Sequence, residues 1–167
     1  GAPRFARDKA LEELADRALA AGDVKSARGI YQALLGRTLD EGKLRTLNVK
    51  LASTADEELR PAIVLLLVGK PGRKPDRAAA SALLGVLDRE RRDDGLPAYL
   101  LARPALDAGD YREAALLLDR ALARRIDVPR VRAEALRLRI VAAAATGDLA
   151  VAEQRLDEYK ALPDVRA

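Results

Sequence analysis

The hexapeptide Gly109-Asp110-Tyr111-Arg112-Glu113-Ala114 decides the fold predicted for this chain, because its pattern occurs three times. The other two copies are Gly22-Asp23-Val24-Lys25-Ser26-Ala27 and Gly147-Asp148-Leu149-Ala150-Val151-Ala152. In each copy the glycine can end a helix in a left-handed conformation, and the aspartate can cap the next helix. The alanine lies one turn into that second helix, where a small side chain lets two helices approach closely. The sequence therefore predicts a repeated helix-turn-helix unit, and such units stack into solenoids.

Apolar residues recur at helical spacing on both sides of these turns. Before the first turn they follow an i, i+3, i+4, i+7, i+8 pattern, at Leu11, Leu14, Ala15, Ala18 and Leu19. The same analysis of the whole chain predicts helices at about 7–21, 24–36, 39–52, from 55, 77–93, 97–108, 111–125, 129–145 and 149–161. Thr54 and Glu57 fit a capping box that would open the fourth helix, and Asp127 is placed to cap the eighth. The apolar run 62–68 predicts a helix that neighbours cover on most sides. The predicted fold class is therefore all-α, with about nine helices.

Composition limits the chemistry that this chain of 167 residues can perform. It contains neither cysteine nor histidine, which removes disulfides, thiolate nucleophiles, the commonest general base and the commonest transition-metal ligands. Its carboxylates lie at helix starts, helix ends or exposed faces, where capping and solvation explain them. We therefore expect no catalytic residue, no cofactor and no metal site, and hence no enzyme.

The three units resemble the tetratricopeptide repeat (TPR), a helix-turn-helix unit of 34 residues. The matching positions are Leu11, Leu14, Ala15, Gly22, Asp23, Ala27 and Tyr31 in the first unit, Leu101, Ala102, Gly109, Asp110, Tyr111, Ala114 and Ala121 in the second, and Leu136, Gly147, Asp148 and Ala152 in the third. The resemblance implies a right-handed α-α superhelix. It also implies a single TPR-like domain over 1–167, with its best repeats at 7–36, 97–126 and 129–162 and a degenerate middle at 37–96. The alternative is an irregular helical bundle in which such turns recur by chance.

If the repeats stack as in that family, the first helix of each unit lines a concave face. The residues expected there are Tyr99, Arg103 and Leu106 in the second unit, Glu134, Arg137 and Val141 in the third, and Glu12 and Asp16 in the first. Some relatives hold the carboxylate at the C-terminus of a peptide with lysine, asparagine and arginine. Asn48 is the only asparagine here, so that particular clamp is not supported. Arg103 and Arg137 could still bind acidic peptide groups, because a guanidinium bonds a carboxylate bidentately. The alternative is that both are solvated surface arginines.

Two groups of basic residues suggest a different partner. The loop cluster consists of Lys70, Arg73, Lys74 and Arg77, and the eighth helix carries Arg130, Arg132, Arg137 and Arg139. Phosphate, RNA or an anionic lipid surface could bind such groups. No aromatic residue is interleaved for base stacking, and the proline and glycine content of the loop is typical of a solvated linker.

The sequence thus predicts a non-catalytic scaffold or adaptor module that binds a peptide or helix of a partner protein on its concave face. The alternative is a helical-repeat module that binds RNA or anionic lipid through its arginines. Self-association through the ninth helix, at Leu156, Tyr159 and Leu162, is also open. Enrichment in arginine and alanine leads us to expect a bacterial source. The compartment is left open between cytoplasm and periplasm, because a chain that begins with Gly1 can lack an upstream targeting segment.

Overall fold

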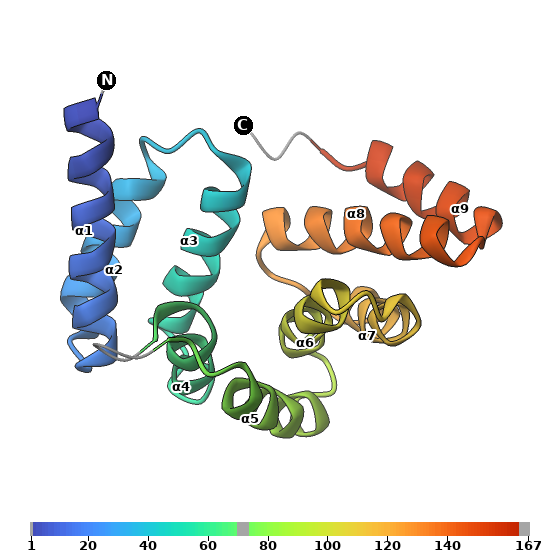
Figure 1. Cartoon of the computed structure of the whole chain (residues 1–167), viewed down its shortest axis with the longest axis horizontal. Coiled ribbons are helices and arrows are strands. Elements are labelled where there is room, and N and C mark those ends of the chain that lie inside the picture. Colours follow the sequence, from blue (N-terminus) through green and yellow to red (C-terminus); the bar gives the residue numbers. More distant parts are fainter. Residues whose placement is uncertain (1, 70–73, 164–167) are drawn as a thin grey trace. The chain divides into compact units, whose positions relative to one another are not determined.

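The computed structural model describes residues 2–69 and 74–163, and these residues form an all-helical protein (Figure 1). Its elements are α1 (Ala2–Ala20), α2 (Val24–Leu35), α3 (Glu41–Ser53), α4 (Leu59–Ile63), the π-helix η1 (Val64–Val68), α5 (Arg77–Glu90), α6 (Leu96–Asp107), α7 (Tyr111–Ala123), α8 (Pro129–Thr146) and α9 (Leu149–Lys160). No β-strand occurs in the described residues, where the one extended pairing is an isolated bridge between Asp94 and Arg125. The all-α class predicted from periodicity is confirmed.

The chain divides into two compact units, Gly1–Leu83 and Leu84–Ala167. From here on, the first and second unit mean these two parts of the chain and no longer the predicted repeats. The first contains the α1–α2 hairpin, on which α3 and η1 pack. The second contains the α6–α7 and α8–α9 hairpins, joined by close packing of α7 on α8. A single superhelical array running through both units remains a prediction.

The three repeated turns share one backbone geometry. Gly22, Gly109 and Gly147 have φ angles of 85°, 74° and 77°, in the left-handed region where a Cβ atom would be strained. The amide after each glycine donates to the carbonyl five residues earlier, at 2.9 Å in all three cases. This bond, together with a shorter-range bond from the glycine amide, makes a Schellman ending of the first helix.

The aspartate of each turn then starts the second helix. Side chains of Asp23, Asp110 and Asp148 accept hydrogen bonds from amides three residues later, at 3.2, 3.1 and 3.2 Å. Each bond satisfies an amide that has no partner inside its own helix. The prediction that the hexapeptide ends one helix and caps the next is thus confirmed at all three sites.

The core of the first unit lies where α2 is covered by α1 and α3. Ala27, Tyr31 and Leu34 of α2 are at most 2% exposed and pack with Ala15, Leu19 and Leu47. Half-buried apolar side chains of η1 lie beside this cluster. The small Ala27 at the crossing lets α2 and its neighbours approach closely, as its place in the motif predicts.

In the second unit a buried aspartate ties α5 to α7. Asp88 is 5% exposed and accepts hydrogen bonds from the guanidinium groups of Arg120 and Arg124, the latter at 2.6 Å. Close by, Gly95 lies against the last turn of α7, where an added Cβ would meet the carbonyl oxygen of Ala121 at 2.3 Å. A side chain at position 95 would therefore push the α5–α6 connection away from α7.

Two predicted caps are wrong. Thr54 does not open α4 but closes α3, since its hydroxyl donates to the carbonyl of Leu51 at 2.6 Å. The N-cap of α4 is Glu58, which makes no side-chain cap, and the amide of Leu59 donates instead to the side chain of Asp56 at 3.0 Å. Asp127 does not cap α8, whose N-cap is Val128; its carboxylate pairs with Arg125. In both places the sequence has a capping pattern, but the side chain makes another local interaction: Thr54 a hydrogen bond to Leu51 and Asp127 an ion pair with Arg125.

The apolar run 62–68 is only partly covered within the described residues. Ala62 and Ile63 of α4 are fully buried, whereas the five side chains of η1 are half-buried. A helix covered on most sides was the prediction, and it is correct for the start of the run alone. Pro61 lies in the first turn of α4, where its missing N–H breaks no helical hydrogen bond.

Candidate functional site

The six residues predicted to line the binding face of the second unit lie on α6 and α8, and four of them are linked by direct polar contacts. Arg103 donates to the hydroxyl of Tyr99 at 3.3 Å, and the same guanidinium lies 4.0 Å from a carboxylate oxygen of Glu134. Arg137 makes two hydrogen bonds of 2.7 Å to both oxygens of Glu134. Leu106 and Val141 lie one turn further along these two helices. We call Tyr99, Arg103, Leu106, Glu134, Arg137 and Val141 the α6–α8 face.

Burial divides this face into a fixed floor and an accessible rim. Glu134 and Tyr99 are 4% and 2% exposed, whereas the side chains of Arg103 and Arg137 are 45% and 51% exposed. Val141 is exposed and Leu106 is half-buried. The two arginines are therefore not freely solvated surface residues. A buried carboxylate orients them while much of each guanidinium still faces water.

The charge balance of the face is positive, because two arginines surround one glutamate. The hydrogen bonds that Arg137 donates to Glu134 raise the pKa of Arg137 above its ordinary value against the opposing effect of burial, and the negative charge of Glu134 adds to this rise. Arg137 is thus fixed as a cation. Its remaining N–H donors, and those of Arg103, can bind a further carboxylate or a carbonyl group.

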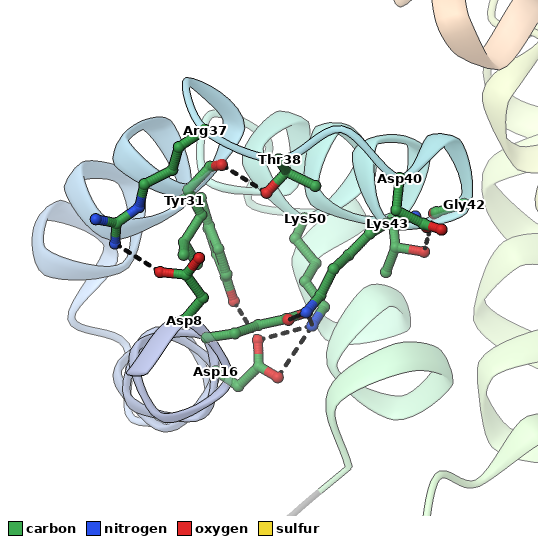
Figure 2. Close-up of polar contacts among 12 residues, drawn as sticks. Asp8, Asp16, Tyr31, Arg37, Thr38, Asp40, Gly42, Lys43 and Lys50 are labelled. Carbon is green, nitrogen blue, oxygen red and sulfur yellow. Dashed lines mark hydrogen bonds and ion pairs between the residues drawn. The ribbon is translucent and has the colours of Figure 1, made fainter. Parts of the chain in front are cut away.

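The sequence analysis missed a second polar site, in the first unit (Figure 2). Lys50 of α3 is 3% exposed, and its ammonium group donates to Glu12 at 3.0 Å and to both oxygens of Asp16 at 2.9 and 3.0 Å. The hydroxyl of Tyr31 donates to Asp16 at 2.7 Å, and Lys43 lies 3.4 Å from Glu12. We call Glu12, Asp16, Tyr31, Lys43 and Lys50 the lysine cluster.

Protonation in the lysine cluster follows from its charges. Burial would raise the pKa of Glu12, but the ammonium groups of Lys50 and Lys43 outweigh that effect and hold this pKa below its ordinary value. The pKa of Tyr31 is raised well above its ordinary value, by burial first and then by the carboxylate of Asp16. Both effects favour the hydrogen-bonded ionic form of the cluster at neutral pH.

Glu12 and Asp16 were expected to face a partner, but they hold Lys50 inside the unit. The spacing of two carboxylates at i and i+4 on one helix, and of two lysines at i and i+7 on another, is visible in the sequence. That pattern shows which residues share a face. It does not show that α1 and α3 bring the two faces together.

Most arginines that suggested a nucleic-acid or lipid surface are engaged within the second unit. Arg139 makes a bidentate pair with Asp119 at 2.8 and 3.2 Å, and Arg155 of α9 reaches the same carboxylate at 3.1 Å. Arg132 donates to the carbonyl of Leu122. Within the loop cluster, Lys70 and Arg73 lie outside the described residues, and Lys74 and Arg77 are exposed.

The described residues carry few other functional features. No group of three acidic residues in the described ranges could hold a metal ion. None of the helices in those ranges is long and apolar enough to span a bilayer. No protein-family model, curated protein or solved structure matches the chain.

Proposed function

We propose that the chain is a non-catalytic, TPR-like scaffold module, and that its α6–α8 face binds an acidic peptide or helix of a partner protein. The single observation that carries this proposal is the arrangement of Arg103 and Arg137. Arg137 donates two hydrogen bonds to the buried Glu134, Arg103 donates to Tyr99 and lies 4.0 Å from Glu134, and both remain about half exposed. Arginine that is oriented in advance loses less side-chain entropy when it binds a carboxylate.

The apolar and aromatic neighbours of these arginines favour a peptide over a small anion. Val141 is 41% exposed on α8, and Tyr159 of α9, close enough to Arg137 to influence its pKa, is 40% exposed. Interfaces between proteins are enriched in arginine and tyrosine, which combine hydrogen bonds with a large contact area. We therefore expect the partner segment to carry carboxylates beside one or two apolar side chains.

The alternative partner, RNA or anionic lipid, has less support. Such a surface needs arginines whose charge is available to phosphate. On α8, Arg139 is 7% exposed and paired with Asp119, and Arg132 donates to the carbonyl of Leu122. The absence of any histidine or cysteine from the chain likewise favours binding over catalysis.

The test is a selection of peptides from a random display library against the immobilised chain. The proposal expects enrichment of peptides in which Asp or Glu alternates with apolar residues. Fluorescence anisotropy then measures the affinity of the best peptide for the wild type and for the double variant Arg103→Glu/Arg137→Glu. We expect binding to weaken by about tenfold or more, because like charges across an interface cost several kcal/mol.

The matched control is the double variant Arg112→Glu/Arg125→Glu, which makes the same change of charge at exposed positions outside the α6–α8 face. It should leave peptide affinity within about twofold. Equal loss of affinity in both double variants would overturn the proposal. So would tight binding of single-stranded RNA or of phosphatidylserine vesicles with steep salt dependence, combined with no enrichment of peptides.

A further inference from the structure

Three helices of this chain follow the same turn, and their equivalent positions can be compared directly. Counted from the glycine of each turn, positions +5, +9 and +12 are Ala27, Tyr31 and Leu34 in α2, Ala114, Leu118 and Ala121 in α7, and Ala152, Leu156 and Tyr159 in α9. The first two sets are at most 2% exposed, and each of these helices is followed by a helix that packs on it, α3 on α2 and α8 on α7. In the third set, Leu156 is 37% and Tyr159 is 40% exposed.

In the described residues α9 is the last helix, and its principal neighbour is α8. Leu149, which is 68% exposed, extends the same apolar stripe by one more turn. We call Leu149, Ala152, Leu156 and Tyr159 the α9 stripe. By its register it is the surface that receives the next helix in the two other hairpins.

The α1 helix has the complementary feature. Counted back from the glycine of the turn that follows, positions −16, −12 and −8 are Val131, Ala135 and Arg139 in α8, all buried against α7. The equivalent positions in α1 are Ala6, Ala10 and Leu14, all exposed, with Leu14 at 54%. We call Ala6, Ala10 and Leu14 the α1 stripe. It occupies the register positions with which α8 covers α7.

One pair of opposite charges accompanies this match. In the α7–α8 pair the contacts run antiparallel, with Asp119 facing Arg139 and Leu122 facing Arg132. Transferred to α9 and α1, those two contacts place Asp157 opposite Leu14 and Lys160 opposite Arg7. Between them and the start of α9, the exposed Glu153 lies opposite the exposed Arg17. An acidic residue on α9 thus meets a basic residue on α1 at the edge of the two stripes. An association of two α9 stripes would instead bring acidic residues together.

We propose that the chain self-associates head to tail, with the α1 stripe of one copy covering the α9 stripe of a second copy as α8 covers α7. The contact is heterologous, because two different surfaces meet, so a dimer retains a free α9 stripe on one copy and a free α1 stripe on the other. Association is therefore open-ended and grows with protein concentration. It uses neither arginine of the α6–α8 face and does not depend on the function proposed above, although both the peptide contact and the self-association involve Tyr159.

The experiment uses two variants that each block one surface, Leu14→Glu and Leu156→Glu. Sedimentation velocity across a wide range of concentration should show dimers and longer oligomers for the wild type and monomers for each variant. A mixture of the two variants should form dimers but nothing larger, because one retains its α9 stripe and the other its α1 stripe. Leu116→Glu, at a position of α7 that is 65% exposed and outside both stripes, is the control and should associate like the wild type.

Exchanging the charges of Arg17 and Glu153 tests the proposed register between α1 and α9. Arg17→Glu and Glu153→Arg should each weaken association by about two- to fivefold, and the double variant should recover it. Circular dichroism confirms that each variant is folded. A wild type that stays monomeric at every concentration overturns the proposal. So does self-association of Leu14→Glu or of Leu156→Glu alone, or a mixture of the two that remains monomeric.

Discussion

The lysine cluster of the first unit and the α6–α8 face of the second are two versions of one arrangement with opposite charges. In the first, two carboxylates on one helix hold a buried lysine; in the second, two arginines hold a buried glutamate. The positions correspond, since Asp16 and Arg103 both lie six residues before the glycine of their turn. The same site in the repeat therefore accommodates either sign of charge when the neighbouring helix supplies the counter-ion.

Exposure distinguishes the two sites. The carboxylates around Lys50 are 17% and 20% exposed, whereas the arginines around Glu134 are 45% and 51% exposed. The lysine cluster is closed by Tyr31 and Lys43, and its hydrogen-bonding groups are used within the unit. The α6–α8 face keeps donors directed at water. The difference indicates that the first site holds helices together and that the second can do so and still bind a partner.

The largest effect on stability should follow from loss of the buried ammonium group of Lys50. Lys50→Met leaves the carboxylates of Glu12 and Asp16 close together without their cation, and we expect a loss of about 3 kcal/mol in the free energy of unfolding. Hydrogen exchange of amides in α1 to α3, together with urea unfolding, measures it. Lys43→Met is the matched control, because its side chain is 32% exposed and should contribute less than about 1 kcal/mol. Equal losses would contradict a closed cluster.

The next effect is a dependence on pH in the first unit. The folded-state pKa of Glu12 lies below its ordinary value of 4.5, so the stabilisation is present above about pH 4.5 and is lost as the pH falls through the lower folded value. At the alkaline end the pKa of Tyr31 lies above its ordinary value of 10.0. The unfolded chain then releases a proton that the folded chain keeps, so stability falls as the pH rises past 10.

Urea midpoints for α1 to α3 across the pH range test both limits. Lys50→Met should flatten the acid limb, because it removes the main cause of the low pKa of Glu12. Tyr31→Phe should flatten the alkaline limb, because it removes the hydroxyl whose raised pKa makes stability fall above pH 10. An acid limb with unchanged slope in Lys50→Met would show that other carboxylates govern it.

A smaller effect on stability is expected from Glu134, the buried charge of the α6–α8 face that plays the part of Lys50 in the lysine cluster. Glu134→Gln removes the charge that holds Arg103 and Arg137, but both guanidinium groups can turn to water. We therefore expect a loss of only about 1 kcal/mol in stability, measured by urea unfolding. Affinity for an acidic peptide should fall by a few fold, because the arginines lose the carboxylate that orients them. A rise in affinity would mean that the charge of the arginines matters more than their orientation.

The turns of this fold were predictable because their signal is local. A glycine that needs a positive φ and an aspartate that caps three residues later lie within one hexapeptide, so the sequence predicted three hairpins correctly. Apolar periodicity likewise placed α2, α7 and α9 within a residue or two of their observed ends. The capping box at Thr54 failed because its hydroxyl found a nearer carbonyl in α3.

The polar contacts were less predictable because they join segments far apart in the chain. Lys50 meets carboxylates 34 and 38 residues away, and Asp88 meets arginines 32 and 36 residues away. Sequence shows which residues share a helix face, as it did for Arg103 and Arg137. It does not show that Glu134 is buried between them, because that depends on how α6 and α8 are brought together by α7.

The smallest effect separates a hairpin that is covered on both sides from one that is not. Asp110→Ala removes the cap of α7, which packs on α6 and α8, and should reduce the free energy of unfolding of the second unit by about 1 kcal/mol. Asp148→Ala removes the same cap from α9, which has no buried residue. Because α9 can fray without disturbing the core, we expect global stability to change by only about 0.3 kcal/mol, with faster hydrogen exchange confined to its first turn. If Asp148→Ala destabilises the unit as much as Asp110→Ala does, α9 unfolds together with the core and not as an edge helix. If that larger loss appears only at high protein concentration, α9 is covered by a second copy.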